Sequence, residues 1–535
     1  MPSTRKARSS KAGQIAAQRF GFDRRASGIL LHPTSLPGPH GSGDLGPGAH
    51  AFVDFLADAG QRWWQMLPVG PPGPPPGNGP YDAYSAFAGS VWLISPQRLR
   101  EDGLLKSADV APDGGLGANA VNYPAMYRHR GQLLRRAFAN FQRDQSHQRA
   151  FEAFCRRARS WLDDFTLFSA LKDRHGGKPW LQWPRDVKLR RADALDRARD
   201  ELGDEIRFHA FCQFLFDRQW EALRTHCRAK QVGLIGDIPI FIGLDSSDAW
   251  ANRELFLLDA SGNPRYLSGA PPDAFSDDGQ LWGHPQYDWA AHRRTKFAWW
   301  VSRFDSMMGR FDGVRIDHFL GFLRTWGVPR KAKTARRGRW LPGPGKAIFD
   351  AIQWALGDVP IIAEDLGLLT PQAAALRDEC GFPGMRVMQF GFGPGGEYHL
   401  PHRYPHRAVA YTGTHDNNTT AGWFAEFAQR NGQASAARRA ERDKVLRYLG
   451  ASGAADVPWE MIRAIMMSVA ETVIMPMQDV LGLGAAARMN FPGVGQGNWR
   501  WRLLPGQLTP ARARRLRELS EVYDRVQQPA VADVE

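Results

Sequence analysis

The chain has 535 residues, of which 43% are hydrophobic and 23% are charged, so it is able to bury a large core. No apolar run reaches the roughly 18 residues that a membrane-spanning helix needs, which excludes a helical membrane protein. The four cysteines form no CxxC motif and no close pair, a pattern that favours a reducing compartment over a disulfide framework. We therefore expect a globular cytoplasmic protein without a membrane partner.

The net charge of +14 raises the question of a nucleic-acid partner. Much of this charge is concentrated, with eight basic residues in 324–346 and four arginines in 512–517. No zinc-finger spacing, RNP motif or basic zipper accompanies these runs. We therefore interpret them as solvated charge and expect no nucleic-acid partner.

The N-terminal segment is basic and lacks the apolar core of a secretory signal. Before its first acid, Asp23, the basic residues are Arg5, Lys6, Arg8, Lys11 and Arg19. We expect a disordered basic tail over residues 1–25. The alternative for this segment is an organelle transit peptide, which has a similar composition.

Eight short segments rich in Val, Ile and aromatic residues, and bounded by turn residues, are predicted strands. In chain order they are 28–32, 63–68, 232–242, 311–317, 360–365, 385–390, 408–412 and 473–479. Helical patterns separate them, and eight parallel β/α units are the number that closes a barrel. The sequence therefore predicts the α/β class and a (β/α)8 TIM barrel over residues 26–505.

Long gaps after the second and third predicted strands indicate large insertions. Residues 96–230 are mainly helical, with helices expected at 126–144, 148–171 and 193–231. Residues 245–300 are rich in Asp, Gly, Pro and Trp and are predicted to be loop-rich. Insertions at the C-terminal ends of barrel strands commonly build the active site. After the eighth strand we expect a C-terminal helix and tail over 506–535, and no C-terminal β-sandwich domain.

Two acids end predicted strands in contexts that suit catalysis. Alternation places Arg315 on the same face as Asp317, and this cation favours the ionised carboxylate that a nucleophile needs. Glu364 ends an apolar strand, so burial is able to raise its pKa and make it a proton donor. The structural alternatives are a strand-end ion pair for Asp317 and a helix cap for the Glu364–Asp365 pair, a role that fits Asp365 better.

A third acid, Asp416, follows His415 in the polar cluster after the strand predicted at 408–412. The alternative for this cluster is a turn or a helix start, where Asp, Asn and Thr are common. Three acids at the C-terminal ends of barrel strands nevertheless favour glycosidic bond chemistry, which uses paired carboxylates.

Ordered blocks of the sequence resemble the amylomaltase-type 4-α-glucanotransferases of glycoside hydrolase family 77, from about residue 27 to residue 505. They include GILLHPTSLPG (28–38), YDAYSAFAGS (81–90), GDIPIFI (236–242), LSGAPPDAFSDDGQLWGHPQY (267–287), GVRIDHF (313–319), AEDLG (363–367), GTHDNNT (413–419) and ARMNFPGVGQGNWRWR (487–502). The resemblance implies an amylase-like barrel that transfers α-1,4-glucan segments between maltooligosaccharides.

By the same resemblance, Asp317 matches the nucleophile, Glu364 the general acid/base and Asp416 the acid that stabilises the transition state. The implied substrate-binding residues are Tyr81, Asp237, Trp282, Arg315 and His415. The implied partners are maltooligosaccharides and linear α-glucans, bound by a monomer or a homodimer without a cofactor. The alternative function is an amylase-type α-1,4-glucan hydrolase with the same residues, because water and a sugar hydroxyl compete for one intermediate.

A metal site is not expected. His399, His402 and His406 have a metal-like spacing, but Pro401 and Pro405 prevent these histidines from sharing one helical face.

Overall fold

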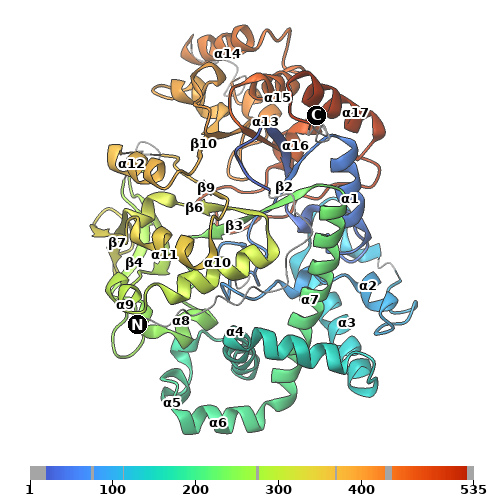
Figure 1. The fold of residues 1–535 in the computed structure, drawn as a ribbon, viewed down its shortest axis with the longest axis vertical. Coiled ribbons are helices and arrows are strands. Elements are labelled where there is room, and N and C mark those ends of the chain that lie inside the picture. Colours follow the sequence, from blue (N-terminus) through green and yellow to red (C-terminus); the bar gives the residue numbers. More distant parts are fainter. Residues whose placement is uncertain are drawn as a thin grey trace, which may run out of the picture.

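The structure is a computed structural model that describes residues 20–73, 78–111, 114–272, 276–367, 370–427 and 436–526. Eight parallel strands form a closed barrel in the order β1-β12-β11-β10-β9-β6-β3-β2 (Figure 1). They are β1 (Ala26–Leu30), β2 (Trp63–Gln65), β3 (Gly233–Pro239), β6 (Gly313–Asp317), β9 (Ile361–Ala363), β10 (Gly384–Val387), β11 (Ala408–Tyr411) and β12 (Thr472–Pro476). Each lies within or overlaps one of the eight predicted strands, so the predicted TIM barrel is confirmed.

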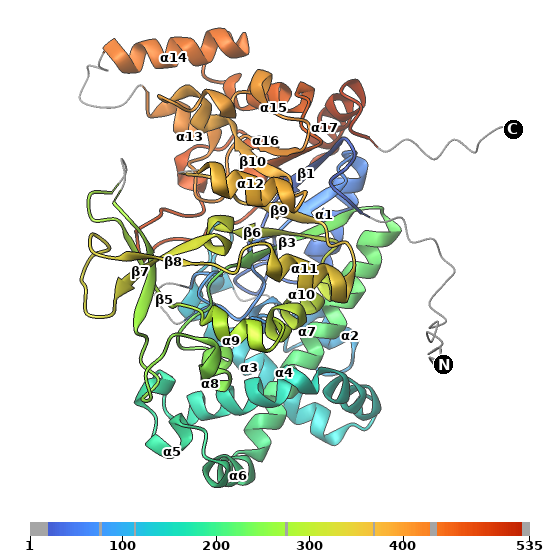
Figure 2. The ribbon, with the colours of Figure 1, turned by 60° about the vertical axis from the view of Figure 1, so that its left-hand side comes forward.

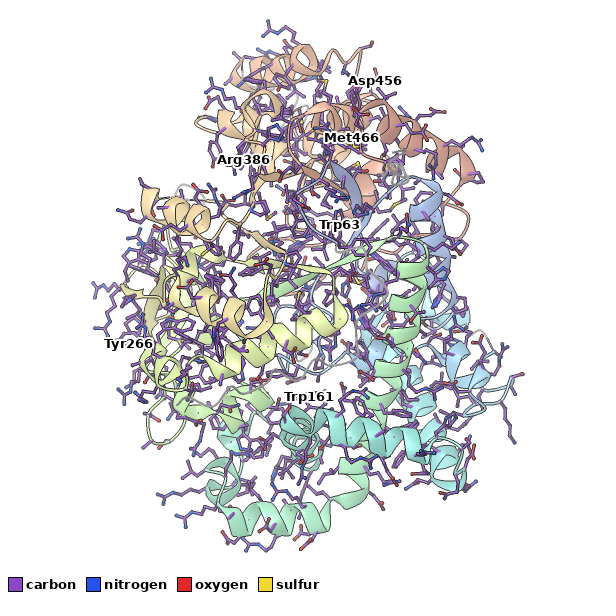
Figure 3. All side chains as sticks on the ribbon, viewed as in Figure 1. Trp63, Trp161, Tyr266, Arg386, Asp456 and Met466 are labelled. Carbon is purple, nitrogen blue, oxygen red and sulfur yellow. The ribbon has the colours of Figure 1, made fainter. Side chains whose placement is uncertain are left out.

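The barrel strands are buried on both faces, which is typical of parallel strands covered by helices. The barrel closes where β1 pairs with β12, with Ala26 opposite Thr472. Trp63 and Trp64 of β2 are fully buried, as expected for residues that pack the second strand, and Trp63 lies near the middle of the molecule (Figure 3).

Helices that are neighbours around the barrel contact one another. α7 contacts α1 and α10, α10 contacts α11, and α17 contacts α1 and α15. Their bounds are α1 (Pro47–Asp58), α7 (Gly203–Ala229), α10 (Ala298–Arg310), α11 (Ala347–Leu356), α12 (Pro371–Glu379), α13 (Thr420–Ala425), α14 (Ala436–Leu449), α15 (Val457–Met467), α16 (Met477–Val480) and α17 (Pro510–Val522). No helix in the described ranges is both long enough and apolar enough to cross a membrane.

The segment between β2 and β3 adds a group of helices at the lower end of the view in Figure 1. It holds α2 (Pro96–Glu101), α3 (Tyr123–Arg143), α4 (Gln148–Arg174), α5 (Arg185–Lys188) and α6 (Ala192–Glu201). The helices expected at 126–144 and 148–171 are α3 and α4. The single helix expected at 193–231 is wrong: α6 and α7 are separate, because Leu202 leaves the helical conformation (φ −111°, ψ 18°) just before Gly203, a weak helix former.

A second sheet, antiparallel and four-stranded, has the order β5-β4-β7-β8 and lies beside the barrel, at the left in Figure 2. Its strands are β4 (Tyr266–Ala270), β5 (Gln280–Pro285), β7 (Arg324–Pro329) and β8 (Arg339–Pro342). α8 (Ser247–Ala251) and α9 (Trp289–Arg294) flank β4 and β5 along the chain. The description of 245–300 as loop-rich and of 324–346 as solvated charge was therefore incomplete, since both regions supply strands to this sheet.

Residues at both ends of the described chain pack against the barrel. Phe20 and Phe22 lie against Trp63, with ring centroids 5.5 and 4.9 Å away. Most of the basic tail expected at 1–25 lies outside the described residues, as do residues 527–535 of the expected C-terminal segment.

Candidate active site

A pocket at the C-terminal ends of β3, β6, β9 and β11 contains the three predicted catalytic acids, Asp317, Glu364 and Asp416. Of the predicted substrate-binding residues, Tyr81, Trp282 and His415 line the same pocket. Asp237 and Arg315 lie beneath it in the barrel, at paired positions of β3 and β6. The structure thus brings all eight predicted site residues together.

Arg315 connects two carboxylates at the base of the pocket. Its Nη1 donates to Oδ1 and Oδ2 of Asp237 at 2.9 and 2.8 Å, and its Nη2 donates to Oδ1 of Asp317 at 3.0 Å. Burial acts to lower the pKa of Arg315, but the two carboxylates raise it well above its ordinary value. The Asp317 side chain is 32% exposed, so it has a fixed cationic partner on one side and faces the open pocket on the other.

Glu364 is held by backbone amides. The N–H of His318 donates to its Oε2 at 2.7 Å, and the N–H of Leu366 donates to its Oε1 at 2.9 Å. Burial raises the pKa of Glu364 to about 7; Arg315 opposes this shift and the charge of Asp317 adds to it. The expectation that burial raises this pKa is confirmed, and a carboxyl group of this kind is able to donate a proton near neutral pH.

The turn after β6 gives His318 its contact with Glu364. His318 has a φ of +52°, a left-handed conformation that is uncommon for residues other than glycine. Its imidazole meets the indole of Trp282 edge to face, with ring centroids 4.9 Å apart. A strained residue directly after Asp317 therefore directs its N–H toward the other central carboxyl group.

Asp416 is the most open of the three acids, with a side chain that is 47% exposed. Nδ2 of Asn490 donates to its Oδ1 at 2.6 Å, and Nε2 of His415 lies 3.4 Å from the same oxygen. Nη2 of Arg488 donates to its main-chain oxygen at 2.7 Å. A carboxylate in this position is able to accept hydrogen bonds from a ligand in the pocket.

Tyr81 joins the two sides of the site. Its hydroxyl donates to Oδ2 of Asp237 at 2.7 Å and lies 2.9 Å from Nε2 of His415. Because the single hydroxyl proton goes to Asp237, His415 donates from Nε2 to the tyrosine oxygen. Burial raises the pKa of Tyr81 well above its ordinary value, so the hydroxyl remains protonated. The ring stacks on that of His415 at 5.3 Å.

Some residues of the site were not predicted. Gln280, His284, Asn490 and Trp499 also line the pocket. Asn490 and Trp499 belong to the block 487–502, whose match to the family was the one signal able to find them. The alternative of a helix cap, which fitted Asp365 better than Glu364, does not apply to Asp365: it accepts the N–H of Met385 at 2.8 Å and pairs with Arg377, while Thr370 caps α12.

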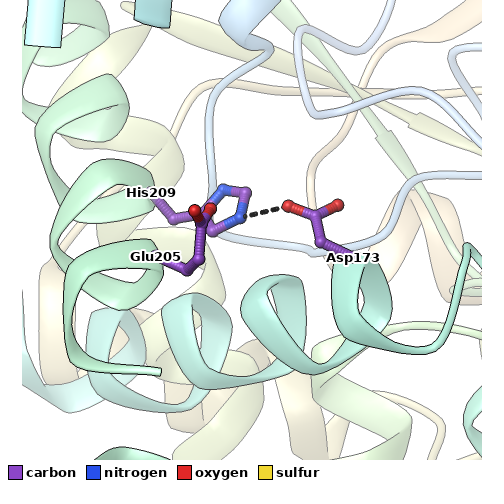
Figure 4. Close-up of side chains that lie close together, drawn as sticks. All are labelled: Asp173, Glu205 and His209. Carbon is purple, nitrogen blue, oxygen red and sulfur yellow. Dashed lines mark hydrogen bonds and ion pairs between the residues drawn. The ribbon is translucent and has the colours of Figure 1, made fainter. Parts of the chain in front are cut away.

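Two other groups of residues do not line this pocket: the histidines His399, His402 and His406, and a cluster on α4 and α7. His399 accepts the N–H of Val387 through Nδ1 at 3.1 Å. On α4 and α7, the ligand atoms of Asp173, Glu205 and His209 lie within 4.8 Å of one another (Figure 4). Asp173 bonds His209 at 2.9 Å and Glu205 pairs with Arg135 at 2.6 Å, so protein groups already compensate these charges.

Comparison with known proteins places these residues in a family. The family model described as 4-alpha-glucanotransferase matches residues 31–508. The chain is 46% identical to a 4-alpha-glucanotransferase of Synechocystis sp. and 45% identical to one of Thermus thermophilus, each over 94% of this chain and 99% of the relative. It also resembles the structure of an amylomaltase from Streptococcus agalactiae in complex with acarbose, with a TM-score of 0.89, 36% identity, and coverage of 94% of this chain and 100% of that chain. The chain therefore belongs to the 4-alpha-glucanotransferase family, glycoside hydrolase family 77.

Proposed function

We propose that this enzyme transfers α-1,4-glucan segments between maltooligosaccharides by a retaining double displacement. The main support is the different environment of two carboxyl groups in one pocket. Asp317 is paired with Arg315, whereas Glu364 has a pKa of about 7. Asp317 is thus suited to nucleophilic attack and Glu364 to proton transfer. Family membership supports a glucan as the substrate.

In the first half-reaction, protonated Glu364 gives its proton to the glycosidic oxygen while Asp317 attacks the anomeric carbon. The C–O bond to the leaving glucan breaks, and an ester bond to Asp317 forms. Arg315 stays with Asp237 throughout and keeps Asp317 oriented. Retention requires the carboxyl groups of Asp317 and Glu364 to lie roughly 5–5.5 Å apart, which is the separation we expect in the enzyme.

In the second half-reaction, ionised Glu364 removes the proton from the 4-hydroxyl of an acceptor glucan, and this oxygen displaces Asp317 from the anomeric carbon. The transition states of both steps resemble an oxocarbenium ion. Asp416, held by Asn490, is placed to accept hydrogen bonds from ring hydroxyls that strengthen in these states. Trp282 offers an aromatic face for sugar stacking.

Incubation of the purified enzyme with maltotriose tests the proposal. We expect glucose together with a ladder of oligosaccharides longer than the substrate, because a sugar hydroxyl accepts the glycosyl group. Glucose and maltose alone, without longer products, would identify the amylase-type hydrolase instead. The same incubation with Asp317→Asn is the control for contaminating activity and should leave maltotriose unchanged. The specific glucan substrates, the monomeric or homodimeric state and the cytoplasmic location stay predictions from the sequence.

A further inference from the structure

The side chain of Arg488 binds the main chain of both Asp416 and Asn490. Its Nη2 donates to the main-chain oxygen of Asp416 at 2.7 Å, and its Nε donates to the main-chain oxygen of Asn490 at 2.7 Å. Asn490 in turn donates from Nδ2 to Oδ1 of Asp416 at 2.6 Å. We propose that Arg488 is a positioning residue that sets Asp416 and Asn490 relative to each other, and so orients the Asp416 carboxylate toward the substrate.

The need for such a residue follows from the exposure of Asp416 and the structure around it. A carboxylate that is almost half exposed is free to rotate unless a neighbour fixes it. Asn490, its nearest partner, lies in an irregular segment after the short 3-10 helix Ala485–Ala487. A planar guanidinium group with donors in a fixed geometry is suited to hold two carbonyl groups of different segments at once.

The surroundings of Arg488 fix its own orientation. Its guanidinium lies over the ring of Phe491, 4.2 Å from the ring centroid. The side chain also lines a small pocket together with His32, His415 and Asn418. Nδ1 of His32 and Oδ1 of Asn418 are buried there without a hydrogen-bond partner among the described residues. Truncation of Arg488 therefore adds a guanidinium-sized space to an existing pocket.

The role of Asp416 in this inference rests on the proposed function, so the first experiment is kinetic. We expect Arg488→Ala to lower kcat for maltotriose disproportionation by about 100-fold, the scale of a small misplacement of a catalytic group, while KM changes less than about threefold. Arg488→Lys should fall between Arg488→Ala and the wild type, because lysine offers only a point charge. Arg500→Ala is the matched control: Arg500 donates to the main-chain oxygen of Val121 at 3.0 Å, and its loss should leave kcat unchanged.

A double mutant separates positioning from general stability. If Arg488 acts through Asp416, Arg488→Ala should lower kcat less than about twofold further in an Asp416→Asn background. Guanidinium ions added at millimolar concentration should restore part of the kcat of Arg488→Ala and leave that of Arg488→Lys unchanged.

Three results would overturn the inference. The first is a wild-type kcat in Arg488→Ala, and the second is a loss of kcat from Arg488→Ala that is equally large in the Asp416→Asn background. The third is a loss of kcat that follows only from a lower unfolding temperature and is not rescued by guanidinium. A wild-type enzyme that forms no ladder from maltotriose would instead contradict the proposed function, because that result does not depend on Arg488.

Discussion

Four carboxyl groups in one site differ in their neighbours, and the neighbours determine their chemistry. Asp237 is buried and shares Arg315 with Asp317, whereas Glu364 has two backbone amides and Asp416 has a side-chain amide. Burial raises the pKa of Asp237, and the contact of both its oxygens with Nη1 of Arg315 opposes that shift. Burial is the largest effect on Glu364 as well and raises its pKa to about 7, although Arg315 and the two backbone amides oppose the shift.

The raised pKa of Glu364 predicts the pH dependence of the first half-reaction. The group is protonated below pH 7 and ionises as the pH rises, so kcat/KM should fall about tenfold per pH unit above pH 7. A 13C NMR titration of the Glu364 carboxyl in the free enzyme should have its midpoint near 7. In Asp317→Asn the midpoint should move down, because the charge of Asp317 contributes to the shift. A wild-type midpoint near 4.5 would contradict the assignment of Glu364 as the proton donor.

The raised pKa of Glu364 also makes the stability of the fold depend on pH. Because the pKa of Glu364 is raised in the folded state, its stabilising contribution is complete below about pH 4.5 and is lost as the pH rises through 7. The free energy of unfolding of Glu364→Gln, which does not ionise at this position, should therefore compare more favourably with that of the wild type at pH 8 than at pH 4. Urea unfolding at the two pH values provides this control without any measurement of activity.

Asp317→Asn should abolish the formation of the glycosyl-enzyme. The amide is a poor nucleophile, so we expect turnover of maltotriose to fall by roughly 1000-fold or more. The amide oxygen is still able to accept from Arg315, so the far-UV circular dichroism and the unfolding temperature should stay close to those of the wild type. Near-normal turnover would remove Asp317 from the role of nucleophile.

Which site residues could be predicted from the sequence depended on whether they lie at the end of a strand or in an irregular segment. Asp317 and Glu364 end apolar strands, so their position at the barrel mouth followed from alternation and topology. Arg488 and Asn490 lie in an irregular segment more than 70 residues after Asp416. No periodicity predicts such a contact, because it depends on how the closed barrel brings two segments together.

At the scale of elements, strand register creates the centre of the site. β3 and β6 pair in parallel with Asp237 opposite Arg315 and Pro239 opposite Asp317. Side chains at opposed positions share a face, so the register alone brings the arginine between two carboxylates inside the barrel. Both members of the Asp237–Arg315 pair are almost completely buried.

This buried pair predicts a large effect of a single deletion. Asp237→Ala removes one of the two carboxylates that pair with the guanidinium of Arg315 in the described structure, and we expect the free energy of unfolding to fall by about 3 kcal/mol. Arg315→Met combined with Asp237→Leu should cost less, since no buried charge is left unpaired. Urea unfolding of both variants measures the difference.

The exposed pair of Arg159 and Asp163 on α4 offers a matched control, and Asp163→Ala should cause little change in stability. Equal losses in Asp237→Ala and Asp163→Ala would contradict a stabilising role for the buried pair.

The elements found and missed by the sequence differ in composition. The barrel strands are buried and mostly apolar and therefore stand out from their surroundings. β4, β5, β7 and β8 instead contain Gly, Pro and basic residues between them, so local composition did not indicate strands. The central pair of the sheet, β4 with β7, also joins segments on either side of β6 in the chain, a contact that spacing does not predict. The break at Leu202 was missed because the apolar pattern continues from α6 into α7.

At the scale of the whole molecule, the two ends of the described chain meet at the N-terminal end of the barrel, opposite the site. Arg525 is completely buried and donates to the main-chain oxygens of Met466, Ala26, Glu471, Ser468 and Ala470. Arg25 donates to the main-chain oxygens of Tyr523, Ser468 and Met466. These contacts connect the chain after α17 to the start of β1 and to the approach to β12, where the barrel closes.

The position of Arg525 predicts a loss of stability without a loss of chemistry. Arg525→Ala leaves several buried carbonyl groups without a donor, and we expect the free energy of unfolding to fall by about 3 kcal/mol. The kcat of the folded enzyme at 25 °C should not change, because the pocket lies at the other end of the strands. Arg517→Ala is the matched control, since Arg517 of α17 also bonds two carbonyls, those of Asp58 and Ala57, but from an exposed position. An equal loss of stability in both variants would show that barrel closure does not depend on the buried arginine, and a lower kcat in Arg525→Ala alone would show that strain at the closure reaches the site.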